Sequence, residues 1–148
     1  MKGKNETLIT TKPVTMNKTA YLLLRLSIGT SMFGHGLVRL PKLTAFSGWM
    51  VGNFTKSMLP LALVTPFSYV LPVAEFAIGL LLITGLLTRQ ALIAGGLVMI
   101  LLIFGTAMIE NWDAIPVQLI HVALFATLLQ FANSNTFALD NLLFRKKI

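Results

Sequence analysis

The stretch FSYVLPVAEFAIGLLLITGLLTRQALIAGGLVMILLIFGTAMI, residues 67–109, decides how the rest of the sequence is interpreted. It contains two apolar runs, residues 67–88 and 90–109, which are separated by Arg89. A helix needs about 20 mostly apolar residues to cross the hydrocarbon core of a bilayer, so each run is long enough to span one. The stretch therefore predicts two consecutive membrane-spanning helices joined by a short turn.

Two further apolar runs flank this stretch, at residues 19–38 and 114–132. Of the 148 residues, 55% are hydrophobic and only 11% are charged, and the mean hydropathy is +0.79. Soluble domains carry about a quarter charged residues, so this composition excludes an ordinary soluble core. Four spans with short loops use up a chain of this length and leave no room for a second domain. We therefore predict an all-α integral membrane four-helix bundle.

The connection between the first two spans, residues 39–66, is too apolar to be solvated coil. Trp49 is suited to the interface between lipid and water, and Pro60 would end a helix. We expect a short amphipathic interfacial helix between helices 1 and 2. The side chains at helical spacing are Phe46, Met50, Phe54 and Ser57.

The two ends of the sequence differ in character from the spans. Residues 1–18 are polar and lysine-bearing, which predicts a mobile cytoplasmic tail, and no convincing cleavage site for a signal peptide follows the first apolar run. Residues 19–148 then form the four-helix membrane domain. After residue 132, a turn-forming Asn133–Asn135 segment precedes apolar residues and a basic end, which predicts a second short interfacial helix on the cytoplasmic side.

The charge distribution predicts a membrane topology and no nucleic-acid partner. The net charge is +7, but the basic residues gather at the ends of the apolar runs and not along one face. Eight Lys and Arg residues lie on the side of the two tails and Arg89, and three lie on the opposite side. The positive-inside rule then places both termini in the cytoplasm. The three residues expected outside are Arg39, Lys42 and Lys56.

Cysteine is absent from the chain. A structural disulfide, a thiolate metal site and a dithiol relay are therefore excluded, and we expect no metal ion. Any redox chemistry must depend on a bound partner.

Four ionisable residues fall within the spans, where a charge is costly unless it finds a partner or water. Counting along the helices predicts that Arg25 and Glu75 form an ion pair, either as part of a site or as a structural staple between helices. His35 and His121 lie near the outer surface, where they serve as packing residues or in proton transfer, and a haem between them is disfavoured. The candidate residues of a polar, ligand-binding cavity are Arg25, His35, Glu75, Gln118 and His121.

The order and spacing of several motifs resemble the DoxX family over roughly residues 19–144. The motifs are an Arg early in span one, the FGHG sequence at 33–36, LPVAEFAIGLLLITGLLTR at 71–89 and FALD at 137–140. The resemblance implies a four-helix bundle in the bacterial inner membrane. The residues that carry its structural motif are Gly36, Lys42, Gly79, Arg89 and Asp140. Gly36 and Gly79 also suit close approach of two helices.

The family is named for a small subunit of a thiosulfate:quinone oxidoreductase, so the resemblance implies a quinone-linked subunit or accessory of a membrane redox complex. A quinone headgroup would then enter the polar cavity, with His35 or His121 as proton donor. The partners would be the bilayer and other subunits of the complex or further copies of the chain. The alternative is a non-catalytic assembly or scaffolding protein. Solute transport is disfavoured because no inverted repeat is visible. Catalytic residues, electron donor and oligomeric state stay open.

Overall fold

The computed structural model describes residues 15–143, and all regular structure in this part of the chain is helical. Most of the predicted N-terminal tail and the basic C-terminal residues lie outside the described residues. The long helices are α1 (Lys18–Arg39), α3 (Leu61–Thr84), α4 (Thr88–Met108) and α5 (Ile115–Gln130). The shorter helices are α2 (Leu43–Phe54) and α6 (Leu139–Leu143). Single 3-10 turns cover Leu40–Lys42, Trp112–Ala114 and Ala132–Ser134.

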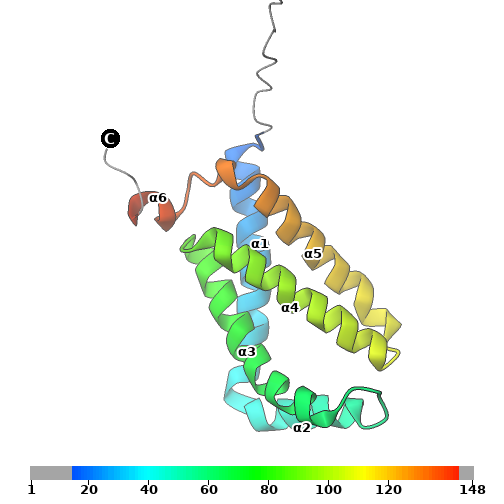
Figure 1. Cartoon of the computed structure of the whole chain (residues 1–148). Helices are drawn as coiled ribbons and strands as arrows, with labels where there is room; N and C mark the ends of the chain where they lie inside the picture. The colour runs from blue at the N-terminus through cyan, green and yellow to red at the C-terminus, as the bar shows by residue number, and fades with distance from the viewer. Residues whose placement is uncertain (1–14, 144–148) are drawn as a thin grey trace, which may run out of the picture.

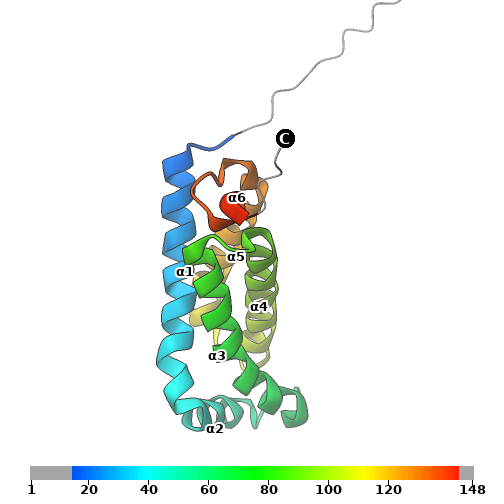
Figure 2. The same ribbon diagram turned by 90° about the vertical axis from the view of Figure 1, so that its left-hand side faces the viewer.

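The four long helices lie side by side, α2 crosses one end of the bundle and α6 lies at the other (Figures 1 and 2). Helix α1 packs chiefly on α3, and α4 packs chiefly on α5. This arrangement confirms the predicted all-α four-helix bundle with a helical segment between its first two long helices. Below, the end that carries α2 is called the α2 end, and the opposite end is called the α6 end.

Three segments are long and apolar enough to cross a membrane, Leu61–Thr84, Thr88–Met108 and Trp112–Gln130. Helix α1 has 22 residues and is also long enough, but its inward-facing polar side chains, such as Arg25, make it less apolar. The predicted span boundaries hold closely except for α3, which begins at Leu61 and not at residue 67. Pro66 therefore lies within α3, near its start.

Two glycines set the register between α1 and α3. A Cβ atom added at Gly36 would overlap the backbone of Phe76, and one added at Gly79 would overlap the backbone of Phe33. The two helices approach each other more closely there than side chains permit, as small residues allow in membrane bundles. Gly36 therefore lies opposite Phe76, and every other pairing along α1 and α3 follows from that offset.

Helix α2 is the predicted interfacial helix, and it is attached to α3 by packing and by one buried hydrogen bond. The Ser47 and Ser68 hydroxyls are 2.7 Å apart. Trp49 is 64% exposed, as a residue at a membrane interface would be. The helix ends at Phe54, and Ser57, which was expected within it, donates instead to the Phe54 carbonyl in the following turn.

At the α6 end, the segment after α5 closes over the turn between α3 and α4. Asp140 accepts hydrogen bonds from the backbone N–H groups of Leu87 and Thr88, at 2.6 and 2.8 Å, and so caps the N-terminus of α4. Gly85 ends α3 with φ of +70°, a conformation that suits glycine. Its carbonyl accepts from the Asp140 N–H at 3.0 Å. The FALD motif thus has a structural role at this turn.

Candidate functional site: a lipid-side cavity with one polar wall

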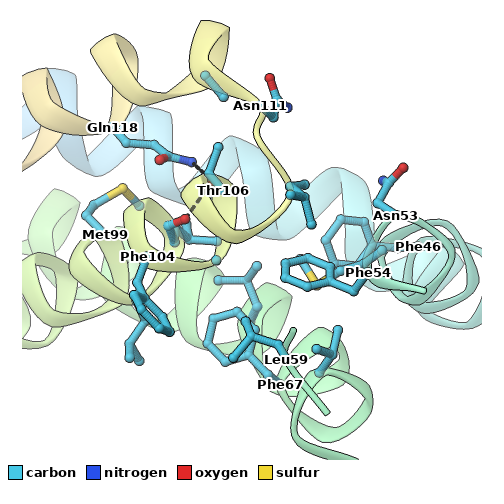
Figure 3. A pocket seen from close by; sticks show the side chains of 18 of the residues that line it. Phe46, Asn53, Phe54, Leu59, Phe67, Met99, Phe104, Thr106, Asn111 and Gln118 are labelled. Carbon is cyan, nitrogen blue, oxygen red and sulfur yellow. Dashed lines mark hydrogen bonds between the residues drawn. The ribbon is translucent and has the colours of Figure 1, made fainter. Parts of the chain in front are cut away.

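A cavity of about 560 Å³ lies near the α2 end, enclosed by α2, α3, α4, α5 and the end of α1. Its walls are mostly aromatic and aliphatic (Figure 3). Five of its large apolar lining residues are also exposed on the outside of the bundle, so the cavity meets the lipid-facing surface. These five are Trp49, Leu63, Leu101, Phe104 and Val117. Its polar lining residues include six that are together called the polar wall below: His35, Arg39, Glu75, Thr106, Gln118 and His121.

The charged part of this wall is an ion pair between Arg39 and Glu75. The Arg39 Nη1 atom lies 2.7 and 2.5 Å from the two carboxylate oxygens. The Glu75 side chain is only 3% exposed, whereas that of Arg39 is 27% exposed. The guanidinium also lies over the ring of Phe46, 4.8 Å from its centroid. The buried carboxylate is thereby neutralised from the rim of the cavity.

His121 is held by two hydrogen bonds. Its Nδ1 lies 2.8 Å from the carbonyl of Val117, and its Nε2 lies 3.0 Å from the Ser31 hydroxyl. A carbonyl only accepts, so Nδ1 carries the proton and Nε2 accepts from Ser31 when the ring is neutral. Both ring nitrogens are therefore occupied by partners within the bundle.

His35 lines the same cavity from α1, one turn beyond Ser31. Its side chain is exposed, and within residues 15–143 it makes no hydrogen bond. Of the two histidines, His35 therefore has the ring nitrogens that are available to a ligand.

Gln118 faces Thr106 across α4 and α5, and Figure 3 shows the bond between them. Its Nε2 donates to the Thr106 hydroxyl at 2.9 Å, and that hydroxyl donates to the Leu102 carbonyl at 2.6 Å. The chain of donors fixes the orientation of the amide. The Gln118 Oε1 atom is then buried without a hydrogen-bond partner among the described residues. Such an acceptor is costly to leave unpaired.

The expected ion pair between Arg25 and Glu75 was wrong, because Arg25 is placed near the α6 end and lines no part of this cavity. Its Nη1 donates to Asn135 Oδ1 at 2.6 Å. The register set by Gly36 and Gly79 brings Arg25 opposite the turn at Gly85, well beyond Glu75. The depth estimate failed because it set the ends of α1 and α3 level. In the structure Gly36 lies opposite Phe76, so α3 begins at Leu61 well beyond the end of α1 at Arg39.

The cation that does pair with Glu75, Arg39, was assigned from the sequence to the outer loop and was missed. A signal for it was present: Arg39 follows His35 by four residues, so the two side chains share a face of α1. Thr106 was also missed, since a lone threonine in an apolar run carries no distinguishing pattern.

The residues of the predicted structural motif occupy both ends of the bundle. Gly36 and Gly79 lie in the α1 and α3 contact, and Asp140 caps α4. Lys42 and Arg89 are exposed at opposite ends. In residues 15–143, no three His, Asp or Glu side chains are grouped as a metal ion would require.

The cavity can hold a molecule with a long apolar part and a small polar head. Arg39 and Gln118 present fixed polar groups, and the ring nitrogens of His35 can donate or accept a hydrogen bond. Its size and its few converging polar groups are typical of small-molecule sites.

Comparison with protein families gives a match to the DoxX family model over residues 20–109, which includes α1 to α4 and excludes α5. No curated protein and no solved structure matches the chain. Of the cavity's polar residues, Asn111, Gln118 and His121 lie outside the matched region.

Proposed function

The chain belongs to the DoxX family, and on this basis we propose that it binds a quinone in the cavity at the α2 end. In this proposal it is a quinone-linked subunit or accessory of a redox complex in the bacterial inner membrane. The observation that supports it most directly is the form of the cavity: an apolar space that meets the lipid side and has one polar wall. A quinone diffuses in lipid by its apolar tail and offers a polar ring, which matches both features.

The residues of the polar wall have distinct roles in the proposal. Arg39 supplies a cation to a carbonyl oxygen at the rim, while Glu75 holds the guanidinium in place. His35 gives or takes the proton, because its ring nitrogens are free of other partners in the described chain. Ser31 and Val117 fix the orientation of His121. Bound quinone supplies the two-electron chemistry itself.

The Gln118 Oε1 atom adds a preference for one redox state. It is an acceptor, so it is satisfied by a ligand hydroxyl and not by a ligand carbonyl. The proposal therefore favours tighter binding of the reduced, hydroxyl-bearing form.

Electrons must reach this site from outside the chain, because the sequence contains no cysteine for a dithiol relay or a cluster. The proposal thus includes a partner subunit that carries the electron donor.

The test is to purify the protein in mild detergent and to identify bound lipophilic molecules by mass spectrometry. The proposal expects quinone at a stoichiometry near one per chain, and a stripped sample that rebinds a short-chain quinol. Absence of quinone together with failure to rebind either redox form would contradict it.

A second candidate, a non-catalytic assembly protein, is favoured by the surface at the α2 end. Met58 is 87% exposed in the loop after α2, close in sequence to the exposed Trp49. Exposed apolar side chains at one end of a bundle are typical of contact with a partner. Cross-linking through a photoreactive residue at position 58 distinguishes the candidates, since assembly predicts one stoichiometric protein adduct whose yield does not depend on quinone.

A further inference from the structure

A second pocket, of about 400 Å³, lies at the α6 end, on the opposite side of the molecule from the quinone cavity. It is formed by α1, the end of α3 and the segment that leads into α6. Leu22, Leu26 and Ile83 form an apolar wall, and Phe137 and Leu142 face them from the C-terminal segment. Thr84, Thr136 and Asn141 add polar groups.

Among residues 15–143, Arg25 is the one charged side chain that lines this pocket, and it is only 2% exposed. Its single hydrogen bond to a described residue is to the neutral Asn135 amide, and its Nε atom is buried without a partner. The only ion pair in residues 15–143 is Arg39 with Glu75. A buried cation without an anion is costly in a bundle that lipid surrounds.

Asp140, in the same C-terminal segment, is the acidic residue to consider as a partner for Arg25, but its carboxylate already has other hydrogen-bond partners. Its two carboxylate oxygens accept from the backbone N–H groups of Leu87 and Thr88. It lies beyond ion-pair distance of Arg25, since no such pair is found in the described chain. Within the described part of the chain, the guanidinium therefore has no direct anionic partner.

We propose that this pocket binds an anionic phospholipid, whose phosphate pairs with Arg25 while an acyl chain lies along the groove between α1 and the C-terminal segment. The occupant is assigned by charge complementarity and by the apolar walls. A free phosphate ion would satisfy the charge but would leave Leu22, Leu26 and Phe137 uncovered. Phe137 and Leu142 are also exposed on the outer surface, so the groove is continuous with the lipid-facing side.

This site is independent of the proposed quinone site. The two pockets share no lining residue and belong to opposite ends of the bundle. Failure of one proposal therefore leaves the other intact.

The test is native mass spectrometry of the whole protein in detergent with three probes. Phosphatidylglycerol carries both phosphate and acyl chains, diacylglycerol with the same chains lacks the phosphate, and glycerol 3-phosphate lacks the chains. We expect phosphatidylglycerol to bind about tenfold more tightly than diacylglycerol, as a charge-assisted contact to a buried group would give. Glycerol 3-phosphate should compete only weakly.

The matched variants are Arg25→Gln and Arg89→Gln, which remove one positive charge at the same end of the bundle. Arg89 is exposed and outside the pocket. Arg25→Gln should abolish the preference for phosphatidylglycerol, and Arg89→Gln should retain it. Equal losses in both would show general surface attraction and would overturn the proposal, as would a wild-type protein without preference.

If Arg25→Gln does not fold, Thr84→Trp is the second variant that tests the proposal. The larger side chain fills the groove and leaves the charge of Arg25 in place. It should weaken phosphatidylglycerol binding and leave quinone binding unchanged. Undiminished lipid binding in a folded Thr84→Trp protein, or competition by glycerol 3-phosphate as strong as that of the lipid, would overturn the lipid assignment.

Discussion

Arg39 at the end of α1 and Glu75 within α3 form an ion pair at 2.5 Å, in which the carboxylate is buried and the guanidinium reaches the rim of a cavity. The two partners are therefore not equivalent. Without Arg39, the carboxylate stays buried and loses its cation. Without the carboxylate, Arg39 can still turn toward water.

This asymmetry predicts that Arg39→Gln destabilises the protein more than Glu75→Gln. We expect a loss of about 2–3 kcal/mol for Arg39→Gln, below the usual cost of breaking a fully buried pair because Arg39 is partly exposed. The double variant Arg39→Gln with Glu75→Gln should recover part of that loss. Reversible unfolding in mixed micelles measures all three. Equal losses in the single variants, or strict additivity in the double, would contradict the interpretation.

The close approach of α1 and α3 predicts a sharp difference between neighbouring glycines. Gly36→Ala should cost about 1–3 kcal/mol, because its new methyl group would overlap the backbone of Phe76. Gly34→Ala is the matched control on the same helix, since nothing lies within 4 Å of its added Cβ atom. It should be neutral or slightly stabilising, as alanine favours helix. Similar melting temperatures for the two variants would show that the helix contact is looser than described.

The cap on α4 predicts a local effect of Asp140→Ala. Losing both acceptors for the Leu87 and Thr88 N–H groups should cost about 1–2 kcal/mol. Hydrogen exchange should accelerate in the first turn of α4 and hardly change in α2. Asp113→Ala, at the exposed turn before α5, is the control and should leave both segments unaffected. Uniform acceleration over the bundle would argue against a capping role.

The proposed quinone site predicts that His35→Ala and Gln118→Leu each weaken quinol binding about fivefold to tenfold, as the loss of one hydrogen bond would. Gln118→Leu should weaken the quinol more than the quinone, because its free oxygen accepts a hydroxyl proton. Gly34→Ala, one residue from His35, should bind normally. Titration in detergent measures the affinities. Unchanged affinity in both site variants would contradict the proposal that quinone binds in this cavity.

The absence of cysteine makes the proposed orientation directly measurable. Asn53→Cys and Gln90→Cys place single exposed thiols at opposite ends of the bundle. With the termini in the cytoplasm, a membrane-impermeant maleimide should label position 53 from the periplasmic side in cells whose outer barrier is opened. Position 90 should label only after the inner membrane is broken. The reverse pattern would invert the topology.

The helices were predictable because a membrane-spanning helix is recognised by its length and its apolar content, and both can be counted in the sequence. The four runs and the amphipathic segment around Trp49 all became helices near their predicted positions. The offset between α1 and α3 was not predictable in the same way. It depends on how Gly36 and Gly79 fit the opposing backbone. The assumption that the ends of α1 and α3 are level paired Glu75 with Arg25, whereas the observed offset pairs it with Arg39.

The candidate site was predictable in part for the same reason. His35, Glu75, Gln118 and His121 line one cavity, because polar residues inside spans must face protein and not lipid. Which of them keep free hydrogen-bonding atoms depends on neighbours such as Ser31 and Thr106. Those two residues are too common in membrane helices to be singled out from sequence alone.

Asn135 bonds to Arg25 of α1 through its oxygen and to Thr88 of α4 through its nitrogen, at 2.6 and 3.1 Å. In the chain, Asn135 follows α1 to α5 and is therefore synthesised after all of them. The first and third long helices in chain order, α1 and α4, can thus be joined through Asn135 only after α5 has been translated. Until then the guanidinium of Arg25 lacks the Asn135 oxygen to which it donates in the folded protein. The contact that joins α1 to α4 is therefore completed only by the C-terminal segment of the chain.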